Sequence, residues 1–418
     1  MQISKIWTKL SELSGVRKIM NDIMKTLSSQ KEWEKLINMS AGNPLVLPEL
    51  LDMWKKHSRE LIDSEEYWEV IWRYWATKWY GKFLDVITKY IKQEFNHDIN
   101  PQENILITWW TQSLYFMAIN TYWWEMEDWT FKKIFLPQNP DYTGYQGMAM
   151  TDDIFIYNEP KFKKTGDHSF KYEIDFDNLP NKKEVWAILL SRPCNPTWNI
   201  VLDSEIEKLH EYVNNTDIPL FLDSAYWTPI PNLAFKEMKT VFHKNMIYWL
   251  SLSKAWLPWE RVWIAVWDSK FLKPLESFQS NLCISSSKFG QALWARAIES
   301  WDLKEISKNI INSFYKNKFK IFNESIKKFM PDNIPYYVHE TEGSMFTFIW
   351  FEDLPISDNE LYEELKKEKV LFVPANSFFA WNSKHSKECL RISITVDDAD
   401  IINSIEILAK VINNVYKK

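Results

Sequence analysis

The chain has 418 residues, of which 46% are hydrophobic and 25% charged, and its formal net charge is −6. This length exceeds one hydrophobic core and predicts a large and a small domain, while the negative charge argues against a nucleic acid or an anionic membrane as partner. No window approaches the ~18 apolar residues of a membrane span, and the N-terminus has no apolar signal region. The three cysteines lack metal-binding spacing, so we expect a cytoplasmic protein without a metal site.

Glycine and tryptophan occur in abnormal numbers, with 8 glycines and 24 tryptophans. Average usage of about 7% would give roughly 29 glycines, close to the two counts taken together. Many tryptophans also stand beside turn residues, as in Asn195-Pro196-Thr197-Trp198-Asn199 and Leu257-Pro258-Trp259. Turns favour glycine where φ is positive. We therefore interpret most tryptophans as glycines whose UGA codon is read as tryptophan; the alternative is a tryptophan-rich core.

The N-terminal third is predicted to be mainly helical. Helical patterns cover 14–27 and 48–62, with a turn at Ser40-Ala41-Gly42-Asn43-Pro44 between them, and Phe83, Ile87, Tyr90 and Ile91 mark one face of a third helix. A short apolar strand at 104–108 then leads into Trp109-Trp110-Thr111-Gln112-Ser113 and another helix. If the tryptophans are glycines, this junction suits a phosphate at a helix N-terminus; otherwise it is a plain strand-to-helix turn.

Apolar runs and helices alternate from there to about residue 290. The runs cover 134–136, 185–190, 219–222, 246–250 and 262–266. Such alternation predicts an α/β fold with a mostly parallel, helix-covered sheet, whose ligands bind at the carboxyl ends of the strands. We expect this large domain to cover 50–290, and a smaller α+β domain to combine 1–49 with 291–418.

Polar residues that could carry chemistry follow these strands. Lys254 lies between two apolar strands, where it is a candidate nucleophile for a carbonyl, although a lone lysine is usually a surface residue. Arg261 could hold a phosphate or make an ordinary salt bridge. Asp223 ends a strand, where it could pair with a protonated ring nitrogen or cap a helix, and Tyr226 could reach a ring hydroxyl. Arg391 sits in an apolar segment, where a bound carboxylate would compensate its charge.

These residues also carry a resemblance to a known family. With tryptophan read as glycine, Ser251-Leu252-Ser253-Lys254-Ala255-Trp256-Leu257-Pro258-Trp259-Glu260-Arg261 resembles the lysine motif of class I and II aminotransferases of fold type I. Asn195-Pro196-Thr197-Trp198, Asp223-x-Ala225-Tyr226 and Arg391 match the same family in order and spacing. Within it, the chain is similar to the valine–pyruvate aminotransferases through Gly42-Asn43-Pro44, Pro140-Asp141-Tyr142-Thr143-Gly144-Tyr145 and Ser191-Arg192-Pro193-Cys194-Asn195-Pro196-Thr197.

The resemblance implies pyridoxal 5′-phosphate (PLP) as cofactor and a homodimer with two sites at its interface. Lys254 would bind the cofactor, Asp223 would pair with its ring nitrogen, and Tyr226 and Asn195 would contact the ring oxygen. Tyr142 would stack on the ring, and Arg391, with the Gly42 backbone beside it, would hold the substrate carboxylate. The phosphate would be held by Trp110 (as glycine), Thr111, Gln112, Ser251, Arg261 and, from the other subunit, Tyr74.

The implied activity is the transfer of an amino group in amino acid biosynthesis, from valine to pyruvate, giving 2-oxoisovalerate and alanine. Alternatives on the same fold are an alanine transaminase, an aromatic or otherwise broad-specificity transaminase, and a C–S lyase. If the tryptophans are real, a non-catalytic scaffold is the alternative, because indoles at 109, 110, 198, 256 and 259 would fill the phosphate site and distort the lysine loop.

Overall fold

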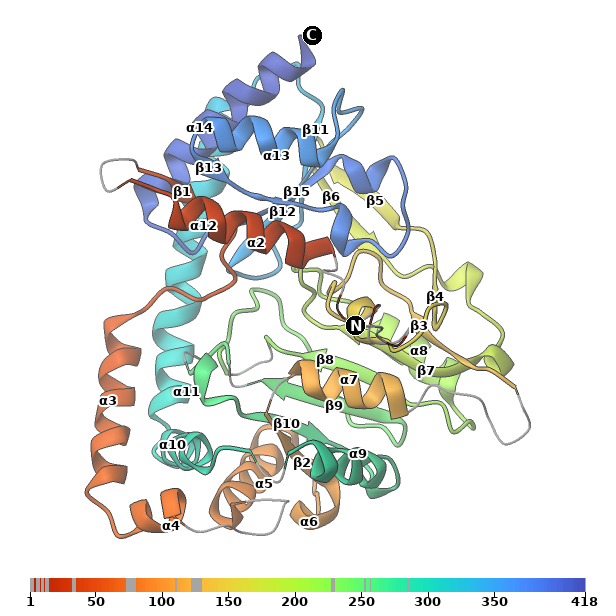
Figure 1. Cartoon of the computed structure of the whole chain (residues 1–418), viewed down its shortest axis with the longest axis vertical. Coiled ribbons are helices and arrows are strands. Elements are labelled where there is room, and N and C mark those ends of the chain that lie inside the picture. Colours follow the sequence, from red (N-terminus) through yellow and green to blue (C-terminus); the bar gives the residue numbers. More distant parts are fainter. Residues whose placement is uncertain are drawn as a thin grey trace.

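A computed structural model describes the protein at residues 4, 8, 11, 15–31, 35–72, 80–109, 111–121, 130–226, 230–251, 253–255, 257–283 and 286–417. Figure 1 shows two sheet-containing parts, with the larger sheet and its helices below and a second sheet with long helices above. Every helix in these ranges is too short or too polar to cross a bilayer.

The larger sheet has seven strands. In spatial order they are β2 (Ile105–Thr108), β10 (Trp263–Val266), β9 (Met246–Ser251), β8 (Leu220–Ser224), β7 (Val185–Ser191), β3 (Lys133–Leu136) and β4 (Phe155–Tyr157). Strand β10 runs antiparallel to both of its neighbours, and the other adjacent pairs are parallel. The sheet is therefore mostly parallel, as predicted.

Helices cover both faces of this sheet, because successive side chains of each buried strand point to opposite faces. Phe221 packs into one core with α7 (Thr111–Thr121) and α9 (Ser269–Leu282), whereas Leu220 and Leu222 pack into the other. The second core includes side chains of α5 (Gly81–Phe95), α8 (Asp203–Val213) and α10 (Lys288–Glu299). The predicted α/β architecture is confirmed.

The second sheet has six strands. Their order is β14 (Val373–Pro374), β15 (Cys389–Ser393), β12 (Phe346–Phe351), β11 (Tyr336–His339), β6 (Ser169–Glu173) and β5 (Lys161–Gly166). The hairpin β5–β6 lies within the range expected for the large domain, yet it pairs with β11 of the C-terminal region. Between β4 and β7 the chain therefore leaves the seven-stranded sheet, adds two strands to the six-stranded sheet and returns. The expected domain boundary at residue 290 did not allow for this excursion.

Helices complete the C-terminal part. They are α11 (Asp302–Ile306), a π-helical turn (Ser307–Ile311), α12 (Asn312–Phe329), α13 (Asp358–Lys367) and α14 (Asp398–Tyr416). The long helices α12 and α14 pack against each other beside the sheet.

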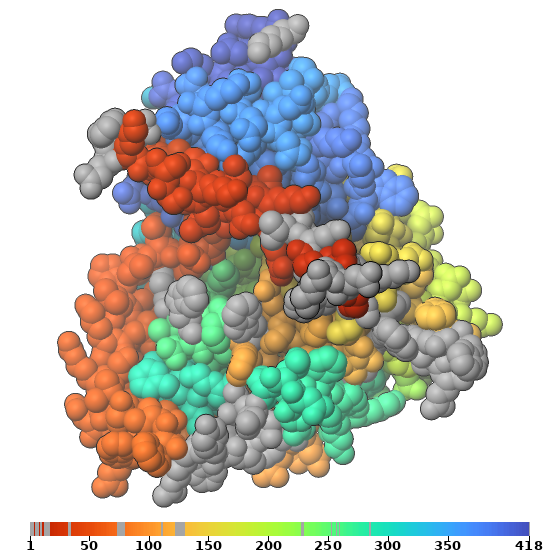
Figure 2. All heavy atoms as spheres, viewed as in Figure 1, coloured from red at the N-terminus to blue at the C-terminus, as the bar shows by residue number. Residues whose placement is uncertain are grey.

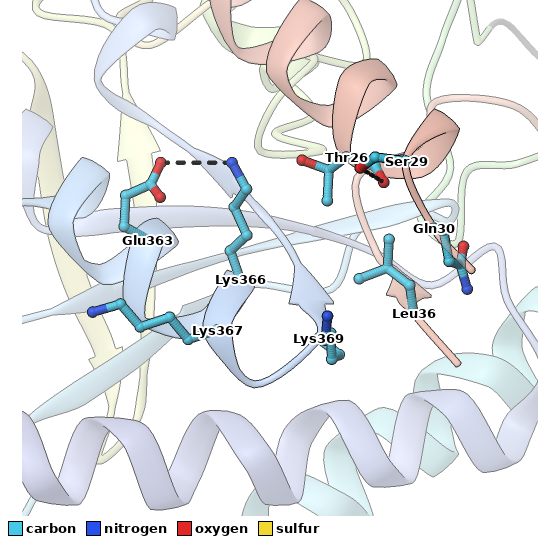
Figure 3. Close-up of a pocket in the computed structure, with 8 residues that line it drawn as sticks. All are labelled: Thr26, Ser29, Gln30, Leu36, Glu363, Lys366, Lys367 and Lys369. Atoms are coloured by element: carbon cyan, nitrogen blue, oxygen red, sulfur yellow. Dashed lines mark hydrogen bonds and ion pairs between the residues drawn. The ribbon is translucent and has the colours of Figure 1, made fainter. Parts of the chain in front are cut away.

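The N-terminal segment packs against this C-terminal part. Strand β1 (Ile37–Asn38) pairs in parallel with β13 (Val370–Leu371), and α2 (Gly15–Ser28) packs Ile23 on Tyr362. Asp22 of α2 accepts hydrogen bonds from Tyr362 Oη at 2.7 Å and Lys366 Nζ at 2.5 Å. A hollow of about 290 Å³ beside this contact is lined by Thr26, Ser29, Gln30, Leu36, Glu363, Lys366, Lys367 and Lys369 (Figure 3).

Three further helices follow α2 in the chain: α3 (Pro48–Ile62), α4 (Glu66–Trp72) and α6 (Pro101–Asn104). Helix α3 descends along one edge of the molecule and contacts α10. Figure 2 shows the N-terminal segment, in red and orange, lying over the blue C-terminal part and then along the lower part. The segment before α3 contacts both parts, because its Ser40 carbonyl oxygen accepts a hydrogen bond from Arg391 of β15 and its Gly42 carbonyl oxygen accepts one from Lys254, just after β9.

Candidate active site

The polar residues predicted to follow strands meet at one edge of the seven-stranded sheet. Ser191 pairs with Asp223 across β7 and β8, and Ser224 pairs with Leu250 across β8 and β9. Trp263, the first residue of antiparallel β10, pairs with both Ser251 and Thr108. The carboxyl ends of β2, β7, β8 and β9 and the start of β10 therefore share this edge, as the rule for open α/β sheets requires.

A cavity of about 340 Å³ opens at this edge. Its wall is formed by Asn43, Gln112, Tyr115, Tyr142, Ser191, Pro193, Asn195, Asp223, Ala225, Tyr226, Ser253, Lys254, Pro258, Arg261 and Trp263. Residues predicted from five separate stretches of sequence thus lie around a single cavity large enough for a small molecule.

Lys254 lies in the short connection between β9 and β10. Its Nζ donates a hydrogen bond to the Gly42 carbonyl oxygen at 2.7 Å and lies 5.7 Å from the Tyr226 ring centroid. Burial, together with the positive charges of Arg391 and Arg261, lowers the pKa of Lys254 to about 8. With this pKa roughly a tenth of the amine is neutral at pH 7, and that fraction can act as a nucleophile or base.

Asp223 presents a buried carboxylate beneath the cavity. Its Oδ2 accepts hydrogen bonds from Tyr145 Oη at 3.0 Å and from Tyr115 Oη, and its Oδ1 accepts one from the Ala225 N–H at 3.1 Å. Burial raises the pKa of Asp223 to about 6, although the phenol hydrogen bonds oppose the shift. Within the described ranges Asp223 forms no salt bridge, so a cationic group entering the cavity would stabilise its charged form.

Arg391 reaches the cavity region from the six-stranded sheet. It is 6% exposed, and it donates from Nη2 to the Ser40 carbonyl oxygen at 2.7 Å and from Nη1 to Asn195 Oδ1 at 3.1 Å. Burial lowers the pKa of Arg391 to about 10. Among the described residues, its hydrogen-bond acceptors are these two neutral oxygens, and its buried Nε has no partner. A buried guanidinium in this state favours a carboxylate ligand.

Tyr142 and Gln112 form the part of the wall nearest α7. Gln112 Nε2 donates to Tyr142 Oη at 3.4 Å. A Cβ at Gly144 would lie 2.2 Å from the Tyr142 ring, so glycine is required there for the ring to take this position. The stacking role expected for Tyr142 stays a prediction.

The remaining predicted site residues differ in placement. Arg261 lines the cavity and donates from Nη1 to the Pro258 carbonyl oxygen at 2.6 Å. Ser251 is fully buried below the loop, where its Oγ accepts the Ser253 N–H at 3.0 Å, whereas Ser253 lines the cavity. Thr111 is the first residue of α7, and its side chain lies outside the description, as do Trp110 and Tyr74 altogether.

Sequence reasoning missed two groups that support this site. Tyr115 binds Asp223, and its signal was its position one helical turn after Thr111. Asp141 accepts hydrogen bonds from Ser191 Oγ, from Ser191 N–H at 3.1 Å and from Tyr142 N–H at 2.7 Å. Burial raises the pKa of Asp141 to about 7. Asp141 lies in the loop that follows the end of β3 at Leu136, so the rule that found Asp223 applied to that loop as well.

A cluster of potential metal ligands lies elsewhere, although no such constellation was visible in the sequence. One side-chain ligand atom each from Glu207, His210 and His243 lies within 4.8 Å of the others. The two imidazole rings are stacked 3.7 Å apart with an interplanar angle of 11°. Because the rings are nearly parallel, their in-plane lone pairs do not converge on one point, and the cluster supports no metal assignment.

The cavity suits the cofactor that the resemblance implies. Asp223 can face a protonated ring nitrogen, and Lys254 offers a partly neutral amine for an aldehyde. The buried Ser253 Oγ and Arg391 Nε have no hydrogen-bond partner among the described residues, so they have unused capacity to bind anionic groups. These donors and acceptors match PLP and a carboxylate-bearing substrate.

Comparisons with known proteins agree with this geometry. Residues 34–408 match the model of the family "Aminotransferase class I and II". The chain is 29% identical over 419 residues to valine–pyruvate aminotransferase of Escherichia coli K12, covering 100% of this chain and 99% of that protein. It also resembles the crystal structure of a putative amino-acid aminotransferase from Psychrobacter arcticum (TM-score 0.93, 28% identity, all of both chains). A second similar structure is valine–pyruvate aminotransferase of Salmonella typhimurium (TM-score 0.86, 28% identity, 97% of this chain and 100% of that one).

The expected fold type I is confirmed by these matches along the full length. The chain belongs to the class I and II aminotransferases, a family of PLP-dependent enzymes.

Proposed function

We propose that this protein transfers the amino group of valine to pyruvate, with PLP as cofactor and Lys254 as the lysine that binds it. The observation that carries the proposal is that one cavity holds an amine of lowered pKa and a buried carboxylate that forms no salt bridge with any described residue, with a buried guanidinium nearby. When bound, PLP supplies an electron sink for the carbanion left after the substrate loses its α-proton.

Each residue around the cofactor has a separate proposed role. Lys254 Nζ removes the α-proton of the substrate and donates a proton again later in the amino transfer. Its pKa of about 8 lets it exchange protons near neutral pH. Asp223 keeps the ring nitrogen protonated, with Tyr115 and Tyr145 fixing its Oδ2. Arg391 binds the substrate carboxylate beside Ser40 and Asn195. Tyr226 and Asn195, which line the same cavity, would contact the cofactor's ring oxygen.

Two observations support valine and pyruvate as the substrate pair. The full-length similarity to valine–pyruvate aminotransferases is one. The other is charge: the described cationic side chains at the cavity are Lys254 and Arg261, with Arg391 adjoining it. Each of these has a role in binding cofactor or α-carboxylate, which favours a substrate with an uncharged side chain.

Paired assays test the substrate assignment. Valine with pyruvate should give the highest kcat/KM, and aspartate with 2-oxoglutarate should react far more slowly. A higher kcat/KM for alanine with a range of other oxo acids would replace the assignment with a broad-specificity transaminase. Release of a thiol from a cysteine conjugate would instead indicate a C–S lyase.

A homodimer is the proposed assembly, with Tyr74 reaching the partner's site. Apolar side chains on and beside α3 and α4, immediately before the segment of Tyr74, support it: Val46 is 69% exposed, Leu51 43%, Ile62 51% and Ile71 47%. An exposed apolar surface of this kind marks an interaction site. Light scattering should give twice the chain mass, and the mass of one chain at assay concentration would contradict the proposal.

The tryptophans decide between an enzyme and a non-catalytic scaffold, and we propose that those in turns are glycines in the native protein. Trp198 has φ of 59° and Trp301 has φ of 63°, whereas none of the described glycines has positive φ. Trp198 is 1% exposed, its indole N–H has no hydrogen-bond partner among the described residues, and a Cβ at Gly343 would lie 2.0 Å from its ring. Positive φ is costly for a bulky residue, and a buried unpaired N–H costs a further ~1–3 kcal/mol.

Intact-mass measurement of the protein from its native source tests this directly. The mass should be lower than that of the printed sequence by one Trp-to-Gly difference per replaced residue, and peptide mapping should find glycine at 198 and 301. A native mass equal to that of the printed sequence, together with failure to bind PLP, would favour the scaffold.

A further inference from the structure

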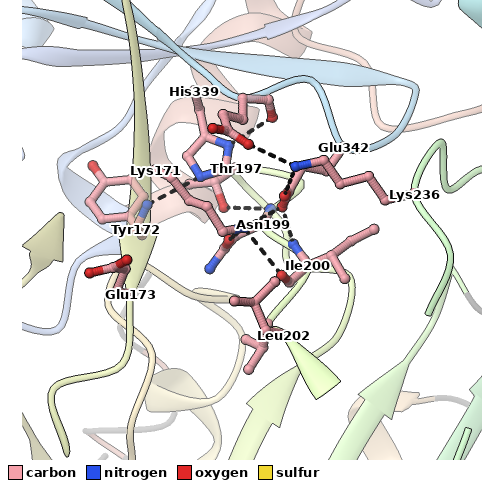
Figure 4. Close-up of polar contacts among 12 residues, drawn as sticks. Lys171, Tyr172, Glu173, Thr197, Asn199, Ile200, Leu202, Lys236, His339 and Glu342 are labelled. Atoms are coloured by element: carbon pink, nitrogen blue, oxygen red, sulfur yellow. Dashed lines mark hydrogen bonds and ion pairs between the residues drawn. The ribbon is translucent and has the colours of Figure 1, made fainter. Parts of the chain in front are cut away.

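A buried ion pair between two parts of the six-stranded sheet binds the turn that follows β7 of the seven-stranded sheet. Lys171 lies on β6, and Glu342 lies in the connection from β11 to β12; Lys171 Nζ is 2.6 Å from Glu342 Oε2. Their side chains are 7% and 0% exposed. Figure 4 shows both pointing inward toward Asn199 and Ile200, with Lys236 approaching Glu342 from the outside at 2.8 Å.

Both members of the pair bind the backbone turn that follows β7. Lys171 Nζ donates to Asn199 Oδ1 at 2.7 Å and to the Ile200 carbonyl oxygen at 3.2 Å, and the Ile200 N–H donates to Glu342 Oε2 at 2.7 Å. The turn is closed by hydrogen bonds from Trp198 N–H to the Cys194 carbonyl oxygen at 2.8 Å and from Cys194 N–H to that of Asn199 at 3.0 Å. The ion pair therefore holds the turn at its end.

The beginning of the same turn carries Asn195, which accepts a hydrogen bond from Arg391. Arg391 lies on β15, in the sheet that also contains β6 and β11. The six-stranded sheet thus binds this turn at two places. Arg391 binds Asn195 near the cavity, and Lys171 and Glu342 bind the other end of the turn. A shift of the turn would move Asn195 relative to the guanidinium that it orients.

Stability alone is a weak reason for this arrangement. Burying two charges carries a desolvation cost, and a hydrophobic pair of similar volume is often as stable. An ion pair that binds a backbone N–H, a carbonyl oxygen and a side-chain amide fixes direction as well as distance, which an apolar contact does not. We propose that Lys171 and Glu342 are positioning residues, which hold the 194–200 turn so that Asn195 and Arg391 bind the substrate carboxylate.

The test combines variants that separate positioning from stability. Lys171→Met and Glu342→Gln each break the pair, Lys171→Met with Glu342→Leu replaces it by an apolar contact, and Asn199→Ala leaves the pair intact but removes one of its anchors. Glu352→Gln is the matched control, because Glu352, just after β12, pairs with Lys164 of β5 at 2.9 Å on the surface, away from the turn.

Two measurements are made on the cofactor-loaded enzyme: KM and kcat for both substrates, and calorimetric binding of isovalerate, which is valine without its amino group. We expect the single variants and Asn199→Ala to raise KM and the isovalerate Kd about two- to thirtyfold with a smaller change in kcat. The double variant should recover thermal stability without recovering KM or Kd. Glu352→Gln should leave all of these values unchanged.

The inference rests on the proposed function, but the isovalerate measurement separates the two. If the wild-type protein binds isovalerate without transaminating, the proposed activity fails and the Kd values still decide the positioning role. Unchanged KM and Kd in folded single variants, recovery of KM and Kd together with stability in the double variant, or no isovalerate binding by the wild type would each overturn the inference.

Discussion

The two sides of the cavity differ in whether their buried ionisable groups can change charge near pH 7. On the side built by the seven-stranded sheet, burial brings the pKa of Lys254 down to about 8 and that of Asp223 up to about 6. On the side built by the six-stranded sheet, Arg391 has a pKa of about 10 and stays charged throughout the neutral range. The first pair can exchange protons near pH 7, whereas the arginine can only bind. In the proposed function, proton transfer therefore depends on the seven-stranded sheet, and binding of the substrate carboxylate depends on Arg391 of the six-stranded sheet.

Replacing Lys254 should have the largest effect on activity, because it removes proton transfer at the cavity. Lys254→Met removes both the nucleophile and the base, so kcat should fall by about a thousandfold or more. Isovalerate should still bind to the cofactor-loaded variant, because Arg391 is unchanged. Stopped-flow assays with valine measure the first effect and calorimetry the second. A variant that retains near wild-type kcat would remove Lys254 from the mechanism.

Replacing Arg391 should break the recognition side instead. Arg391→Gln keeps a hydrogen-bonding group but removes the charge, and loss of a buried charged partner costs about 2–5 kcal/mol. KM for valine and for pyruvate should both rise, by at least about thirtyfold, and the cofactor should still bind. Steady-state kinetics on both substrates check this result. Equal losses in the binding of cofactor and of both substrates would show that the two sides are not separable.

The rate at which the cofactor-free protein binds PLP should depend on pH, with a smaller effect than either substitution. This dependence tests the lowered pKa of Lys254. The folded-state pKa of Lys254 lies below its usual 10.5, so below about pH 8 the amine is mainly protonated and unreactive. The rate of PLP incorporation into cofactor-free protein should fall about tenfold per pH unit below that value and level off above it. Absorbance of the bound cofactor follows this rate from pH 6 to 9. A rate independent of pH in that range would contradict the lowered pKa of Lys254.

The residues around the cavity were easier to predict from the sequence than the contact of Lys171 and Glu342 with the 194–200 turn. Asp223, Asn195 and Lys254 were found because each follows an apolar run, and carboxyl ends of parallel strands share an edge. The direction of β10 was not predictable, because a short apolar run is the same in either direction. Lys171 and Glu342 are separated by 171 positions and meet only because the β5–β6 hairpin crosses to the second sheet. No local pattern records such a contact.

The central claim is that Lys254 is the residue that binds the cofactor in this cavity. The most direct test is to load the protein with PLP, reduce the complex with borohydride and map the modified peptide by mass spectrometry. If Lys254 binds the cofactor, a single pyridoxyl-modified lysine will be found at position 254, and none in Lys254→Met. Modification at a different lysine, or no stable modification of a protein that carries its native residues, would contradict it.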